Sequence, residues 1–166
     1  TKIDSNIDVL GDLKPGNKLY EDINFVEDNF GGTLPLEIII NVSDEIDITN
    51  NNLFYNRVNL FSNKLINYSA IKTLDSYWNL DGQLNGQLNK YTNSDRSQIR
   101  ISCGIKNINS NEALHLKSQI KNDYNSIFNN DNIIITGSTL LALKMNKYLI
   151  KSLLSSFLIA FIIIFI

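Results

Sequence analysis

Residues able to do nucleophilic or metal chemistry are scarce in this chain of 166 residues. Cys103 and His115 are the only residues of their kinds. One thiol cannot form an internal disulfide, and one cysteine with one histidine cannot complete a tetrahedral zinc site by themselves. Any serine or cysteine nucleophile that needs a histidine base would depend on His115 alone. The sequence therefore predicts no catalytic residue, no metal site, no cofactor and no enzyme activity.

The surroundings of these two residues favour structural roles. Cys103 lies in the segment QIRISCGI, where apolar and polar residues alternate as in a strand with one buried face. His115 lies between Leu114 and Leu116 in a helical pattern, so a partly exposed imidazole on a helix surface is favoured over catalysis. We expect a buried, inert thiol and a solvated imidazole.

Two further groups have residue types that occur in ligand sites. Asp44, Glu45 and Asp47 offer carboxylates, but they lack the spacing and the glycine of a calcium loop, so a solvated loop is favoured. Tyr77 and Trp78 can border either the edge of a core or a ligand groove, and covering a core edge is the commoner role. Neither group gives the chain a predicted binding site.

The charge balance disfavours nucleic-acid binding. Lys and Arg number 15 against 17 Asp and Glu, which gives a formal net charge of −2. The only arginines are Arg57, Arg96 and Arg100, so there is no basic stripe for a phosphate backbone. Hydrophobic residues at 43% and charged residues at 19% are close to the averages of globular proteins, and the length suits one ordinary domain.

The first predicted element is a helix that follows a polar lead-in broken at Pro15. Asn17 is its expected N-cap, and carboxylates in its early turns suit the helix dipole. Gly31 is expected to end the helix in the left-handed conformation, since no phosphate-loop signature follows it. The apolar residues of one helix face follow at i, i+4, i+7 and i+11: Leu19, Ile23, Val26 and Phe30.

The rest of the body alternates between strand and helix patterns. Short runs of β-branched residues predict strands, and apolar residues at three- and four-residue steps predict helices. The helix predicted at residues 109–129 is expected to bury Ala113, Leu116, Ile120, Tyr124 and Ile127. The predicted order is strand 35–42, helix 53–67, strand 70–76, an irregular crossing 77–97, strand 98–105, helix 109–129 and strand 132–136.

This order predicts an α+β fold. Two β-α-β units in one sheet give the ferredoxin-like β-α-β-β-α-β arrangement, an antiparallel sheet with helices on one face. Right-handed crossovers favour that topology.

The chain closes with a strongly apolar segment that Ser138 or Thr139 is expected to cap as a helix. After Lys151 no residue is charged, and residues 157–166 are wholly apolar, which a soluble helix would not be on every side. Lys144, Lys147 and Lys151 recur at helical steps before it. We therefore expect membrane insertion. Because about 20 residues are needed to cross the hydrocarbon core, we expect this span to be truncated.

Three segments follow from these patterns. Residues 1–34 form the lead-in and the amphipathic helix, and residues 35–137 form the ferredoxin-like domain. Residues 138–166 form a helix that enters the membrane as a truncated span. Since the chain begins with a threonine rather than a start methionine, we expect the sequence to be clipped at both ends.

Three stretches resemble the extracytoplasmic loop of the resistance-nodulation-division (RND) superfamily, in its MMPL or patched-like exporter branch. NKLYEDINFVEDNFGGTLPLEIIINV is similar to the start of that loop, where a helix ending in Asn-Phe/Leu-Gly-Gly precedes the first strand. LNKYTNSDRSQIRISCGI is similar to the central strand and its approach. IIITGSTLLALKMNKYLIKSLLSSFLIAFIIIFI resembles the exit, a strand and a Thr-Gly-Ser turn followed by the helix that re-enters the membrane.

The resemblance implies a porter domain of a proton-driven exporter of hydrophobic or amphiphilic molecules in a bacterial inner membrane, with the main domain extracytoplasmic. The expected partners are membrane lipid, the substrate and the remainder of the transporter chain, and a homo-oligomer is compatible with them. The family's proton-coupling carboxylates lie in membrane helices outside this chain, so the resemblance assigns no site residue here.

The alternative is a ferredoxin-like binding or sensing domain held by a single membrane span. The lysines before the span favour this alternative, because the positive-inside rule would place them, and the domain, in the cytoplasm. An enzyme on the same fold, such as an acylphosphatase-like hydrolase, would need an arginine and an anion-binding loop after the first strand. Asp44 and Glu45 stand there instead.

Overall fold

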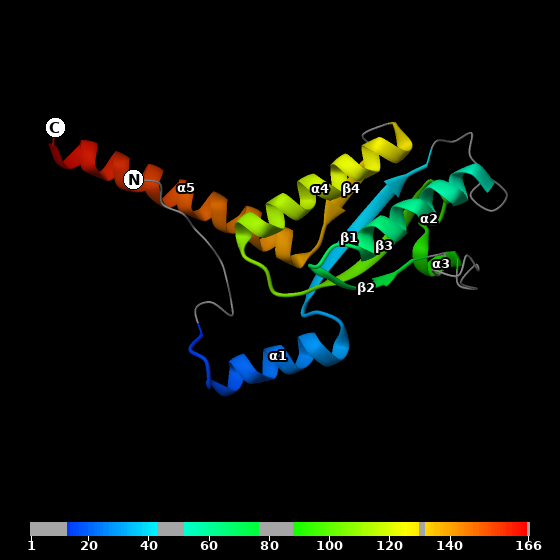
Figure 1. Cartoon of the computed structure of the whole chain (residues 1–166). Helices are drawn as coiled ribbons and strands as arrows, with labels where there is room; N and C mark the ends of the chain where they lie inside the picture. Colours follow the sequence, from blue (N-terminus) through cyan, green and yellow to red (C-terminus); the bar gives the residue numbers. More distant parts are fainter. Residues whose placement is uncertain (1–12, 43–51, 77–87, 130–131, 166) are drawn as a thin grey trace.

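A computed structural model describes residues 13–42, 52–76, 88–129 and 132–165 of the chain. Its elements follow the predicted order, and their bounds differ from the predicted ones by only a few residues (Figure 1). The predicted crossing contains a short helix, α3. The elements are α1 Lys18–Phe30, β1 Leu34–Asn41, α2 Asn52–Ile66, β2 Ile71–Asp75, α3 Leu88–Tyr91, β3 Gln98–Ile105, α4 Ser110–Phe128, β4 Ile133–Thr136 and α5 Ser138–Phe165.

The four strands form one antiparallel sheet in the order β2-β3-β1-β4. Ile38 in the middle of β1 lies opposite Ile101 of β3 on one side and Ile135 of β4 on the other. Sequence neighbours β1 and β2 are therefore separated by β3, which returns between them. The predicted α+β class with an antiparallel sheet is confirmed.

The core lies between one face of this sheet and the helices α2 and α4, which run across it side by side (Figure 1). Period-two alternation puts every second strand residue on that face. On β3 these residues are Ile99, Ile101, Cys103 and Ile105, all of them buried as predicted. Phe61 of α2 packs edge-to-face on Tyr124 of α4, with ring centroids 5.5 Å apart.

The last turn of α4 corrects one predicted core residue. Ala113, Leu116, Ile120 and Tyr124 are buried as expected, but the fifth core residue is Phe128, and Ile127 is only partly buried. Phe128 stacks on Tyr124 with centroids 4.5 Å apart. The helix therefore continues its core stripe by a step of four residues, because a large ring at that position fills the space beside Phe61.

Helix α1 confirms its predicted caps but packs differently from α2 and α4. The Asn17 side chain accepts a hydrogen bond from the Leu19 amide at 2.9 Å, and Gly31 takes the left-handed conformation with φ 83°. None of the residues of α1 is buried. The Glu27 carboxylate attaches the helix to the body by accepting hydrogen bonds from the Thr33 hydroxyl and the Asn107 amide.

Helix α5 begins at Ser138, which is one residue earlier than a Ser138 cap predicts and two residues earlier than a Thr139 cap predicts. Ser138 is already helical, and the Leu141 amide donates to the carbonyl of Gly137 at 3.0 Å. The cap position is therefore Gly137, with φ 133°, where a Cβ would lie 2.4 Å from the Pro35 carbonyl oxygen. The joint needs a glycine because the first turn of α5 lies directly against β1.

Candidate functional site

Several segments meet at the end of the sheet from which α5 leaves. Here β1 begins at Leu34, β2 begins at Ile71 and β3 ends at Ile105, since both Leu34 and Ile71 lie opposite Ile105. The helices α4 and α5 also begin at this end, and α5 then extends away from the body (Figure 1). We call this the α5 end of the body.

A groove of about 540 Å³ opens at the α5 end. It lies between the α2–β2 turn, the β3–α4 connection and the first half of α4, and its volume is in the usual range for small-molecule sites. Ile108 and Leu116, which are only 6% and 5% exposed, line it together with Ala70, and Lys106 and His115 supply polar groups. The groove can hold an apolar group beside a polar one.

Tyr68 forms one wall of this groove and is held there by an acid. Its hydroxyl donates to Asp123, whose other oxygen accepts from Lys64 Nζ at 3.0 Å. The hydrogen bond from Tyr68 and the charge of Lys64 lower the pKa of the Asp123 carboxyl despite its partial burial. Burial, followed by the bond to Asp123, raises the pKa of Tyr68. The wall is thus tied to α4 by a charge-assisted network.

The two single-copy residues occupy the places that the sequence predicted. Cys103 is 4% exposed on the inner face of β3, and its burial raises the pKa of the thiol to about 12. A thiol with that pKa is almost wholly protonated at neutral pH and is a poor nucleophile. His115 is exposed on the surface of α4, where it lines the groove.

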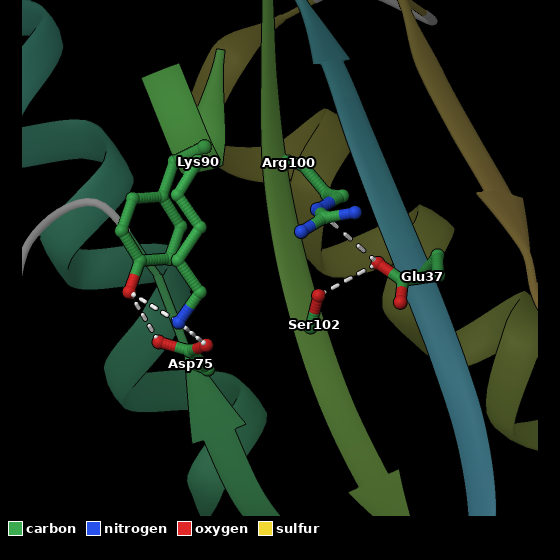
Figure 2. Close-up of polar contacts among 6 residues, drawn as sticks. Glu37, Asp75, Lys90, Arg100 and Ser102 are labelled. Atoms are coloured by element: carbon green, nitrogen blue, oxygen red, sulfur yellow. Dashed lines mark hydrogen bonds and ion pairs between the residues drawn. The ribbon is translucent and has the colours of Figure 1, made fainter. Parts of the chain in front are cut away.

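The open face of the sheet carries a row of polar side chains from three strands (Figure 2). Asp75 of β2, Ser102 of β3 and Glu37 of β1 are direct neighbours in the register. The Ser102 hydroxyl donates to Glu37 Oε2 at 2.8 Å, and Arg100 Nε lies 3.8 Å from the same oxygen.

The second half of this polar face is centred on Asp75. Lys90 Nζ donates to it at 2.7 Å and the Tyr91 hydroxyl at 2.6 Å (Figure 2). Partial burial acts to raise the pKa of Asp75, but the bonds from Lys90 and Tyr91 and the charges of Lys90 and Arg100 outweigh it and lower the pKa. Both carboxylates of the row therefore have cationic partners, which suits a stabilised polar face rather than acid–base catalysis.

Sequence reasoning did not find the groove, the Asp123 network or the polar face. Asp75 and Lys90 stand 15 positions apart, so no local pattern connects them. Within the described residues, no three His, Cys, Asp or Glu side chains are grouped so that they could hold a metal ion. The segments with Asp44, Glu45 and Asp47 and with Tyr77 and Trp78 lie outside the described residues.

The second half of α5 differs from everything else described. Residues Tyr148–Phe165 form an 18-residue stretch with a mean hydropathy of 2.2, and none of it is buried against the body. By length and composition this helix can cross a membrane.

Comparisons with known proteins do not assign a function to this chain. No protein-family model matches the chain, and no curated protein matches it. What remains is an α+β body with a groove at one end and a long apolar helix that leaves from that end.

Proposed function

We propose that this chain is an extracytoplasmic porter domain of an RND-type, proton-driven exporter, together with the membrane helix that follows it. The observation that carries the proposal is the continuity of α5. It starts on the sheet directly after Gly137 and runs without interruption into an 18-residue stretch of high mean hydropathy, Tyr148–Phe165, that no part of the body covers. Exposed apolar surface of that extent requires lipid or another protein chain.

The topology of the body supports the finer assignment to a ferredoxin-like porter domain. The element order β-α-β-β-α-β and the strand order β2-β3-β1-β4 are those of a split β-α-β fold. The resemblance of the sequence to RND extracytoplasmic loops implies the same kind of body between a preceding helix and a membrane helix.

The places where α1 and α5 join the body also support it. Gly32, just after α1, lies so close to β3 that a Cβ would be 2.6 Å from the Ile105 carbonyl oxygen. Gly137, just before α5, lies equally close to the start of β1, where a Cβ would be 2.4 Å from the Pro35 carbonyl oxygen. Chain entry and chain exit are therefore at one end of the sheet, as a domain inserted between two membrane-proximal segments requires.

The groove is our candidate for a part of the substrate path. It opens at the same end, its lining includes the buried side chains of Ile108 and Leu116, and Lys106 and His115 offer polar contacts. A lining that combines buried apolar side chains with several polar groups, Glu112 among them, suits amphiphilic molecules without demanding one exact shape.

Dye accumulation in cells tests transport. A bacterial strain that lacks the gene is complemented with the whole gene, and the uptake of a hydrophobic fluorescent dye such as Nile red is followed with and without a protonophore. We expect complementation to lower accumulation and the protonophore to restore it. His115→Trp should fill the groove and raise accumulation several-fold, whereas Leu114→Trp, one residue away and 53% exposed, should not. Equal accumulation with and without the gene would refute the exporter.

The alternative, a membrane-anchored binding or sensing domain, is favoured by one observation. Lys144 and Lys147 precede the apolar stretch and Lys151 lies near its body-side end, where the positive-inside rule would place the cytoplasm. Labelling of a Lys117→Cys variant with a membrane-impermeant maleimide distinguishes the two. Buried Cys103 contributes little background. Labelling in intact cells supports the exporter topology, and labelling only after permeabilisation supports the alternative.

A further inference from the structure

The stretch of α5 between the body and its most apolar part is a basic neck. Leu140 packs into the core at 5% exposure, and Leu141 is already 57% exposed. From there to Lys151 the helix carries Lys144, Lys147 and Lys151. We call residues 141–151 the neck.

The lysines of the neck lie on one side of the helix. At about 100° per residue, the positions 144, 147 and 151 fall within about 60° of one another around the axis. The whole of α5 contains no acidic residue. Within the part of the chain that the structure describes, no carboxylate pairs with the exposed Lys144 or Lys151. Three lysines so close together on a helix without acidic residues would repel one another, so this cluster of charges fits an anionic partner.

We propose that the neck lysines bind the headgroups of anionic phospholipids and gather these lipids around α5. The inference rests on the proposed membrane insertion of α5. The apolar stretch begins at Tyr148, between the lysines, so insertion brings the headgroup layer to the neck. Tyr148, 74% exposed, has the amphipathic ring that is enriched at such interfaces.

The dimensions of the neck agree with this partner. From Lys144 to Lys151 the helix rises about 10 Å, somewhat more than the roughly 5–8 Å of one headgroup layer, so not all three Cα atoms fit within that layer. Long lysine stems can lie along the helix while their ammonium groups reach phosphate oxygens, which explains how Lys151 fits inside an apolar stretch. A nucleic acid would be a poor alternative occupant because the chain as a whole is acidic, with a net charge of −2.

The neck also positions the body. A step of only four positions, or about 6 Å of helix, leads from Leu140 in the core to Lys144 at the headgroups. The α5 end of the body, with its groove, would therefore face the lipid surface closely.

Lipid co-purification tests the proposal. The full chain is reconstituted into vesicles of phosphatidylglycerol and phosphatidylcholine in a one-to-nine ratio, extracted gently, and its retained lipid is quantified by mass spectrometry. We expect phosphatidylglycerol to be enriched about five-fold over the bulk ratio, the effect of one well-engaged lysine at a membrane surface. The triple variant Lys144→Gln, Lys147→Gln, Lys151→Gln should retain the bulk ratio.

The matched control removes the same charge elsewhere, through Lys18→Gln, Lys72→Gln and Lys117→Gln, and should keep the enrichment. Recovery of the wild-type chain in vesicles without enrichment would overturn the lipid proposal and leave the membrane helix intact. An equal loss of enrichment in the control would overturn it too, because net charge alone would then explain the effect. Failure of the chain to enter vesicles at all would overturn both this proposal and the proposed function.

Discussion

The body and the second half of α5 use the same apolar residues in opposite ways. Ile101 in the centre of β3 is fully buried, whereas Ile159 in α5 is 56% exposed. In the body, polar residues alternate with apolar ones, so one face of each strand can turn towards α2 and α4. In α5 after Lys151 no charged residue interrupts the apolar surface. The comparison shows that the spacing of polar residues along the chain, and not hydrophobicity alone, decides whether an isoleucine is buried by the body or left exposed on α5.

One substitution made in both regions should give the largest contrast. Ile101→Ala removes fully buried methyl groups beside Ile38, and we expect the body to lose about 2–5 kcal/mol of its free energy of unfolding. Ile159→Ala should leave the unfolding of the body unchanged. Urea unfolding of the detergent-solubilised chain, followed by circular dichroism, measures both. Equal losses would show that α5 packs on the body.

A charge introduced into α5 should affect membrane insertion and leave the stability of the body unchanged, the reverse of the effect of Ile101→Ala. Ile159→Lys places an ammonium within the apolar stretch, and we expect membrane insertion to become less favourable by about 2.5–3.5 kcal/mol. The unfolding of the body should not change, because Ile159 makes no core contact. A glycosylation-based insertion assay reports the first quantity. Unaltered insertion of the variant would speak against lipid as the environment of α5.

The Asp123 network offers a test inside the body. Asp123→Asn removes the carboxylate that accepts from Tyr68 and Lys64, and we expect a loss of about 1–3 kcal/mol at neutral pH. The folded-state pKa of Asp123 is lowered, so its contribution is present above about pH 4 and is lost as the pH falls through the lower folded value. The carboxyl of Asp123 is expected to titrate between about pH 5 and about pH 2. Because the variant lacks this carboxyl, it should lose less stability than the wild type over that range.

The smallest effect is expected at a buried hydroxyl. Tyr124 is fully buried, and its hydroxyl has no hydrogen-bond partner within the described residues. Burial raises the pKa of this phenol to about 12. Tyr124→Phe keeps the ring that packs on Phe61 and Phe128, and we expect it to stabilise the body by up to about 1 kcal/mol. Thermal unfolding measures this shift, and a clear loss of stability would reveal a partner for the hydroxyl.

Local patterns were enough to predict most elements of the body. Residues 98–105 alternate so regularly that the predicted strand and its inward side chains match the structure. Asn109 with Glu112 forms a capping box, so the start of α4 is determined within four residues. The exceptions, Phe128 in place of Ile127 and Gly137 at the start of α5, depend on what lies across from them. The spacing of apolar residues along one helix does not show which residues of other elements will lie opposite it.

The sequence by itself determined the helix and strand order, the buried setting of Cys103, the exposed helix-surface setting of His115 and the apolar character of α5, because each follows from spacing over a few residues. Only the tertiary structure decided the groove and the polar row of Asp75, Ser102 and Glu37. The row depends on strand register, and the groove exists because α2 ends and α4 begins at the same end of the sheet, where the α2–β2 turn and the β3–α4 connection both line it. Both join residues tens of positions apart, and such proximity arises only when the strands pair and the helices pack.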